Sequence, residues 1–110
     1  MAIEQVQPLS MLLTPDGDGN VVLTVGGEVD VLTADQLRAA LNESLTLWEG
    51  QVVVDFAGVS FLDSQGIAAL LRVHKDCGLD PGRLTIRSPQ PQARKVFELT
   101  GLDTILRIEN

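Results

Sequence analysis

The sequence predicts an α/β fold whose elements follow the order β-β-α-β-α-β-α-β. Short β-branched, apolar segments alternate with segments in which apolar residues recur every three or four positions. Such alternation implies a partly parallel sheet with crossover helices. The chain has 110 residues, of which 45% are hydrophobic, so residues 1–110 are expected to form a single domain with its own core.

The first two strands are expected to form a β-hairpin. Residues 11–14 are apolar, and residues 21–25 are β-branched or apolar at alternate positions. Residues 16–20 between them read Asp-Gly-Asp-Gly-Asn, residue types that tolerate turn geometry. The same run hints at a calcium loop, but Val21 and Gly27 replace the glycine and glutamate that such a loop requires. A turn is therefore the favoured interpretation.

The first helix is expected to begin at Thr33. With Gln36 three residues on, Thr33 has the spacing of a capping box. Apolar residues then recur on one face of a helix that is expected to end near Gly50. These apolar residues are Leu37, Leu41, Leu45 and Trp48.

The next strand, at residues 52–56, is almost continuously apolar, which favours a central position that is buried on both faces. Asp63 or Ser64 is expected to cap a second helix, with Gly78 at its end. The expected core face of that helix is Ile67, Leu70, Leu71 and His74.

The C-terminal part is expected to hold two more strands and one more helix. A turn at Pro81-Gly82 leads into a half-exposed strand at residues 83–87. Ser88-Pro89 is expected to start the last helix, because proline is favoured at a first helical position. That helix is expected to have Val96, Phe97 and Leu99 as its apolar residues, to stop at Gly101 and to be followed by a strand at residues 105–108.

Composition limits the classes of partner. The net charge of -7 argues against nucleic acid and against an anionic membrane surface, and it favours a partner with a basic patch. The first ten residues do not resemble a signal peptide, and no apolar stretch approaches the ~20 residues of a membrane span. With one cysteine and one histidine, neither a disulfide nor a usual zinc site is expected, and a cytoplasmic location is the simplest.

The sequence also argues against an enzyme. His74 lies ten residues after Ser64 on the same expected helix, about 15 Å away, which is too far for a serine–histidine pair. There is no Gly-x-Ser-x-Gly elbow, and Gly26-Gly27 is too short to be a phosphate-binding loop. No cofactor, metal or catalytic residue is therefore expected.

The most informative segment is residues 52–71, in which a buried strand and a short loop deliver Asp63-Ser64-Gln65-Gly66 to a helix start. Backbone N–H groups at a helix N-terminus stabilise anions, including a phosphate on Ser64. A phosphate there is expected to leave the fold intact. Asp63 can accept hydrogen bonds from those N–H groups and orient the Ser64 hydroxyl, and plain helix capping remains the simpler alternative from spacing alone.

Residues 61–67, Phe-Leu-Asp-Ser-Gln-Gly-Ile, resemble the phosphoacceptor motif of STAS domains, specifically the bacterial anti-sigma factor antagonists. Residues 27–30, Gly-Glu-Val-Asp, look like the end of the second strand in that family. Ser88-Pro89 and residues 96–102 look like its Ser-Pro and Leu-Thr-Gly-Leu segments. The three matches occur in the same order and spacing over nearly the whole chain.

The resemblance implies a mixed, mainly parallel sheet of about five strands with helices chiefly on one face. It implies a protein that, when unmodified, binds an anti-sigma factor with serine kinase activity and so releases the sigma factor. Phosphorylation of Ser64 would block that binding, and a metal-dependent PP2C-type serine phosphatase would reverse it. The implied partner-binding residues are Asp30, Asp63, Ser64, Gln65 and Gly66.

Two departures from the family pattern stand out. Gln65 takes a place where the family often has a second hydroxyl residue, which makes Ser64 the only acceptor in the motif. The chain stops at Asn110, so contacts made by the extra helix of longer relatives are expected to be absent. The alternative is a small STAS subunit of a lipid-transport ABC system or of a stress-sensing assembly. A monomer or weak dimer is expected in either case.

Overall fold

The computed structural model describes residues 7–80 and 82–110, and its centre is one five-stranded sheet. The strands lie in sequence order, with the first pair antiparallel and all later pairs parallel. The mixed, mainly parallel sheet is therefore confirmed. The strands are β1 (Ser10–Pro15), β2 (Val21–Val29), β3 (Val52–Leu62), β4 (Leu84–Arg87) and β5 (Arg107–Glu109).

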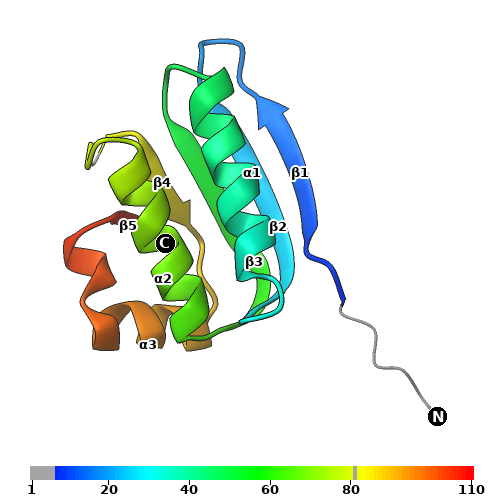
Figure 1. Ribbon diagram of the computed structural model, residues 1–110, viewed down its shortest axis with the longest axis vertical. Coiled ribbons are helices and arrows are strands. Elements are labelled where there is room, and N and C mark those ends of the chain that lie inside the picture. The colour runs from blue at the N-terminus through cyan, green and yellow to red at the C-terminus, as the bar shows by residue number, and fades with distance from the viewer. Residues whose placement is uncertain (1–6, 81) are drawn as a thin grey trace.

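The helices connect the parallel strands. Each parallel connection moves the sheet one strand in the same direction, and right-handed crossovers then place the helices on the same face. Figure 1 shows the first two helices side by side in front of the sheet, with the third lying across the end where β3 meets the second helix. The helices are α1 (Ala34–Leu47), α2 (Ser64–Asp76) and α3 (Pro91–Thr100), followed by a short 3-10 helix, η1 (Leu102–Thr104).

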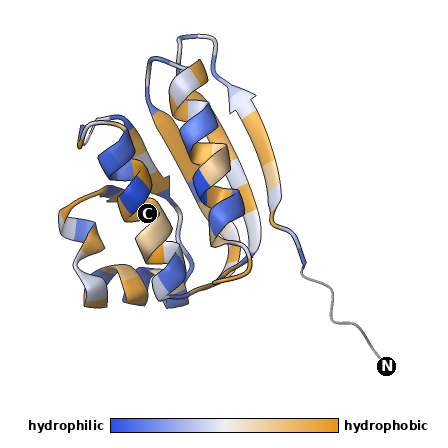
Figure 2. Cartoon of the chain, viewed as in Figure 1, coloured by the Kyte–Doolittle hydropathy of each residue, from blue (hydrophilic) through white to orange (hydrophobic). Residues whose placement is uncertain are grey.

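The hydrophobic core lies between the helices and one face of the sheet. Alternate residues of the central strands point into it, in register, as Leu23 beside Val54 and Val52 beside Leu84 illustrate. Figure 2 shows these apolar stripes on the strands behind the helices. By contrast, β1 contacts chiefly β2, and all six of its residues are exposed.

The strand β3 is longer than the sequence predicts, since it continues to Leu62. Two register shifts against β2 give β3 two extra residues, so that both strands end opposite each other, with Val29 beside Leu62. The short loop that was expected before Ser64 does not exist. A single residue, Asp63, joins the central strand directly to α2.

Some features of the other helices differ from the sequence predictions. The start of α3 is Pro91, with Gln90 at the N-cap, because Ser88 has a left-handed backbone (φ 56°) and its N–H bonds the carbonyl of Glu109. Leu99 is exposed instead of buried, whereas Gly101 stops the helix as predicted. In α2, Ile67, Leu70 and His74 are buried as predicted, Leu71 is only partly buried, and Val73 completes the core face.

The C-terminal strands also differ in detail. The first three residues of β4 are buried, not half-exposed, because β4 lies between β3 and β5. The last strand begins at Arg107, and the segment predicted to start it instead contains exposed Ile105. The turn predicted at Pro81-Gly82 falls partly outside the described residues.

Candidate functional site

The candidate site lies at the edge of the sheet where β2 and β3 end. Val29 and Leu62 are paired, and the backbone N–H of Asp63 donates to the carbonyl oxygen of Val29 over 3.1 Å. Neighbouring strands lie about 4.8 Å apart, so Asp30 and Asp63, which directly follow the paired residues, lie at the same edge. The fold thus brings together two segments that the sequence separates by more than 30 residues.

Asp63 is the N-cap of α2. Its carboxylate Oδ1 accepts hydrogen bonds from the backbone N–H groups of Gln65 (2.9 Å) and Gly66 (3.3 Å). Its backbone carbonyl accepts from Ile67 N–H over 3.2 Å, which is the first turn of the helix. The capping role of Asp63 is therefore confirmed.

Ser64 is the first residue of α2, and its side chain is exposed. Within the described residues its hydroxyl makes no hydrogen bond, so the expected orienting bond from Asp63 is absent. Because the strand leads straight into the helix, the hydroxyl projects from a fixed backbone instead of a loop. It is open to another protein or to an enzyme that modifies it.

A phosphate on Ser64 would share the N-terminal N–H groups of α2 with Asp63. The Asp63 carboxylate already takes the N–H groups of Gln65 and Gly66. A phosphate on Ser64 would share the partial positive charge of the helix N-terminus with that carboxylate. The two anions would therefore repel each other while the helix start attracts both.

Gly66, which the resemblance places among the partner-binding residues, is buried and has a packing role. A Cβ on this residue would overlap Leu62 Cδ1 and come within 2.8 Å of Val29 Cγ1. The absence of a side chain lets the first turn of α2 pack onto the ends of β2 and β3. Gly66 therefore positions Ser64 by allowing close packing, whereas Gln65 is exposed beside it.

The loop after β2 is held by its own side chains. Asp30 is partly buried, and its Oδ1 accepts from Leu32 N–H over 2.9 Å. The Thr33 hydroxyl donates to the carbonyl of Glu28 (2.6 Å) and accepts from the N–H of Asp30 (3.0 Å). The capping box predicted for Thr33 and Gln36 is therefore wrong, since Thr33 makes no side-chain cap bond.

Gln92 fixes the end of β3, a role that the sequence did not indicate. Its Oε1 accepts from the N–H of Leu62 and its Nε2 donates to the carbonyl of the same residue, both over 2.8 Å. This clamp from α3 acts two residues before Ser64. No local pattern could reveal it, because the two residues lie 30 positions apart.

Exposed apolar residues follow or end the same two strands. Val31 and Leu32 are 68% and 62% exposed, and Phe61 is 40% exposed. Large exposed apolar side chains near a polar site are typical of protein interaction surfaces. The resemblance included Phe61 as part of the motif, but Val31 and Leu32 were not singled out from the sequence.

The polar groups at the site are the exposed Ser64 hydroxyl and the capping Asp63 carboxylate. In residues 7–80 and 82–110 no three His, Cys, Asp or Glu residues gather into a metal site. His74 is only 6% exposed and lies on the core face of α2, ten residues beyond Ser64. None of the helices in this part of the chain is long and apolar enough to cross a membrane.

Comparison with known proteins agrees with the resemblance seen in the sequence. The STAS domain family model matches residues 12–110. BtrV, a candidate anti-sigma factor antagonist of Bordetella bronchiseptica, is 32% identical over 101 residues, which cover 91% of this chain and 87% of BtrV. An anti-sigma F factor antagonist of Lysinibacillus sphaericus is 33% identical over 85 residues, covering 74% and 71% of the two chains.

Solved structures of anti-sigma factor antagonists are also similar to this chain. The anti-sigma factor antagonist SpoIIAA in its unphosphorylated form superposes with a TM-score of 0.72 at 25% identity, over 92% of this chain and 89% of that one. The phosphorylated form of the Bacillus cell fate determinant SpoIIAA superposes with a TM-score of 0.65 at 25% identity, over 92% of both chains. The similarity covers both β–α junctions of the candidate site.

Proposed function

The chain belongs to the STAS domain family, and on that premise we propose that it is an anti-sigma factor antagonist controlled by phosphorylation of Ser64. The unmodified protein binds an anti-sigma factor that has serine kinase activity, and the sigma factor is released. Phosphorylation of Ser64 ends the binding, and a PP2C-type serine phosphatase restores it. The protein acts in the cytoplasm as ligand and substrate, with no cofactor of its own.

The observation that carries this proposal is the exposed Ser64 hydroxyl on a rigid support. The hydroxyl has no hydrogen-bond partner among the described residues, while Asp63 and Gln92 fix the backbone beneath it. A kinase can therefore reach the oxygen without opening the fold. The same edge presents Val31, Leu32 and Phe61, which supply apolar surface for docking.

The charge of a phosphate is large enough to switch such an interface. A phosphoserine carries about -1.5 to -2 at neutral pH. A partner carboxylate ~4 Å away would be opposed by about 4 kcal/mol per unit charge pair at an effective dielectric of 20. Taking binding from nearly full to nearly empty needs about 5.5 kcal/mol, or ~10⁴ in affinity. Repulsion together with the cost of desolvating the phosphate supplies this locally.

A large conformational change is not needed for this switch. The chain superposes over 92% of its length on SpoIIAA in both its unphosphorylated and its phosphorylated form. This similarity supports a fold that is kept in both states. The acceptor edge changes its charge, and the partner responds to that change.

The test uses the anti-sigma kinase of the same organism, with binding measured by calorimetry and modification by mass spectrometry. Ser64→Ala should bind but resist phosphorylation, and Ser64→Asp should bind at least ~100-fold more weakly. Ser60→Ala is a matched control, because Ser60 is an exposed serine on β3, the strand that leads to Ser64. Phosphate on Ser60 instead of Ser64, or equal binding of all three variants, would overturn the proposal.

A further inference from the structure

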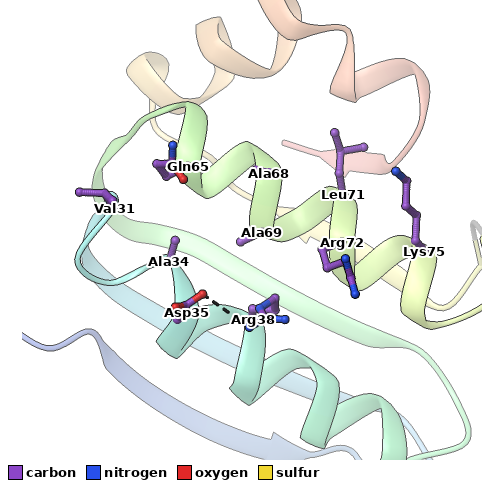
Figure 3. A pocket seen from close by; sticks show the side chains of 10 residues that line it. All are labelled: Val31, Ala34, Asp35, Arg38, Gln65, Ala68, Ala69, Leu71, Arg72 and Lys75. Carbon is purple, nitrogen blue, oxygen red and sulfur yellow. Dashed lines mark ion pairs between the residues drawn. The ribbon is translucent and has the colours of Figure 1, made fainter.

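A groove runs between α1 and α2 and begins beside the proposed acceptor. Its volume is about 520 Å³, and its lining includes Gln65, the residue after Ser64. Along α2 the lining extends from Gln65 to Lys75, about 15 Å at helical rise. Figure 3 shows the groove with the side chains that line it.

The groove is cationic, although the protein is acidic. Three of the eight Lys and Arg residues of the chain line it, whereas only one of the 15 Asp and Glu residues does. Arg38 from α1 and Arg72 from α2 reach into the space between the helices, and Lys75 follows one turn further along α2. The chain has a net charge of -7, but the residues that line this groove include more cations than anions.

The cations of the groove are weakly engaged within the chain. Arg38 lies 3.6 Å from a carboxylate oxygen of Asp35, whose side chain is 92% exposed, and Arg72 pairs with Asp76 over 3.3 Å. Exposed pairs of this kind contribute only about 0–1 kcal/mol. Lys75 is in no ion pair in the part of the chain that the structure describes. A carboxylate from another molecule can take the two guanidinium groups by paired hydrogen bonds.

The two ends of the groove differ in chemistry. Near Ser64 the lining combines Gln65 with small or apolar residues, namely Ala34, Ala68 and the exposed Val31. Arg38 lies midway along the groove, and Arg72 and Lys75 lie toward its far end. A ligand that fits both ends has an apolar or small part beside the acceptor and carboxylates further along the groove.

We propose that this groove binds an acidic segment of the same anti-sigma partner whose docking Ser64 controls. The inference rests on the proposed function, since the groove is continuous with the Ser64 edge through Gln65. A polyanionic surface such as nucleic acid or a membrane would meet the acidic remainder of the chain, whereas a short acidic segment meets only the groove. The groove thus orients the partner and adds contacts that do not depend on the hydroxyl itself.

A zero-length carbodiimide cross-link tests the contact directly, because the chain has only two lysines, Lys75 in the groove and Lys95 on α3. Both side chains are exposed. The unmodified complex with the anti-sigma kinase should yield a Lys75 amide to an Asp or Glu of the kinase. Lys75→Arg should remove that product while binding is retained, and Lys95→Arg should not. A cross-link through Lys95 alone, or through neither lysine, would overturn the inference.

A matched pair of charge reversals tests the energetics. Arg72 and Arg107 each pair with a nearby carboxylate, and their side chains are 65% and 61% exposed. Arg72→Glu should weaken binding of the unmodified protein ~10- to 100-fold, and the loss should shrink at high salt. Arg107→Glu on β5 should change it by less than about threefold.

The outcomes separate the two proposals. If the wild type neither binds nor is phosphorylated, the proposed function fails. If the wild type binds but both arginine variants bind equally well, only the groove inference fails.

Discussion

Two strand-to-helix junctions lie side by side at one edge of this sheet, and each places a hydroxyl residue at a helix start. At the β2–α1 junction, residues 30–33 separate strand from helix, and the Thr33 hydroxyl is buried and bonded on both sides. At the β3–α2 junction only Asp63 intervenes, and the Ser64 hydroxyl is exposed without a partner among the described residues.

The difference shows how similar residues at similar positions acquire different roles. In the longer junction the side chains satisfy their own loop, so Thr33 is occupied with structure. In the shorter junction the carboxylate before the helix does the capping and the clamp from Gln92 holds the strand end. The hydroxyl of Ser64 is therefore the one that remains available for chemistry.

The largest effect is expected from removing the occupied hydroxyl. Thr33→Val removes the donor to Glu28 and the acceptor for Asp30 at a site that is 3% exposed. The free energy of unfolding should fall by about 3 kcal/mol, whereas Ser64→Ala should change it by less than about 0.5 kcal/mol. Urea denaturation measures both. Equal losses for the two variants would remove the distinction between the junctions.

Removing the Gln92 clamp should give the next largest loss in the free energy of unfolding. Gln92→Ala leaves the N–H and the carbonyl of Leu62 without their side-chain partner, and unfolding should become easier by about 2 kcal/mol. Gln65→Ala, an exposed glutamine at the other side of Ser64, is the control and should stay within about 0.5 kcal/mol. If the control lost as much stability, the clamp would not be what holds this junction.

The repulsion between two carboxylates at the start of α2 should have a smaller effect on the free energy of unfolding. Ser64→Asp should cost about 1 kcal/mol because the new carboxylate lies beside that of Asp63 in solvent. In the Asp63→Asn background this cost should vanish, since a single acid at a helix N-terminus is favourable. A double-mutant cycle at low and high salt measures the coupling, and additive effects would contradict it.

The smallest effect on stability is expected at Asp55, a carboxylate on β3 that forms an ion pair with Arg87. Burial raises its pKa, but hydrogen bonds from Arg87 (2.9 Å) and from Ala57 N–H (2.9 Å) outweigh burial and lower the pKa below its ordinary value. A lowered folded pKa gives stability that is complete above the unfolded value, near 3.9, and is lost as pH falls through the folded value.

Asp55→Asn should therefore flatten the acid side of the stability curve. Urea midpoints measured from pH 6 down to pH 2 should fall less steeply in the variant than in the wild type. Binding of the anti-sigma partner at pH 7 should stay the same, because the ion pair with Arg87 lies away from the acceptor edge. An unchanged slope would mean that this pair does not contribute to acid stability.

The order of elements and the capped helix start at residues 63–64 could be predicted because their signals are local. The apolar period of α2, the Asp-Ser pair before it and the glycine at its end occur within some 16 adjacent residues. The capping box expected at Thr33 and Gln36 does not form. Thr33 donates to the carbonyl of Glu28 and Gln36 accepts from the N–H of Leu9, and neither contact is visible in the local pattern. Register shifts between β2 and β3 likewise depend on pairing across the sheet.

The exposed surface was the least predictable part of the site. The charge count favoured a basic partner, yet the groove beside Ser64 is cationic because helices far apart in the sequence bring their arginines together. The packing role of Gly66 against Val29 and Leu62 was not predicted either, because the two strand ends that it contacts meet only in the folded sheet. A sequence motif identifies the residue set but not which side chains face outward.

The reach of Gln92 has a consequence for when the acceptor becomes competent during protein synthesis. The strand that leads to Ser64 is complete at residue 62, but the side chain that fixes its end is synthesised with the last third of the chain. A polypeptide still emerging from the ribosome would display the serine without its rigid backing. We therefore expect the backbone beneath Ser64 to reach its fixed geometry only after Gln92 has been synthesised.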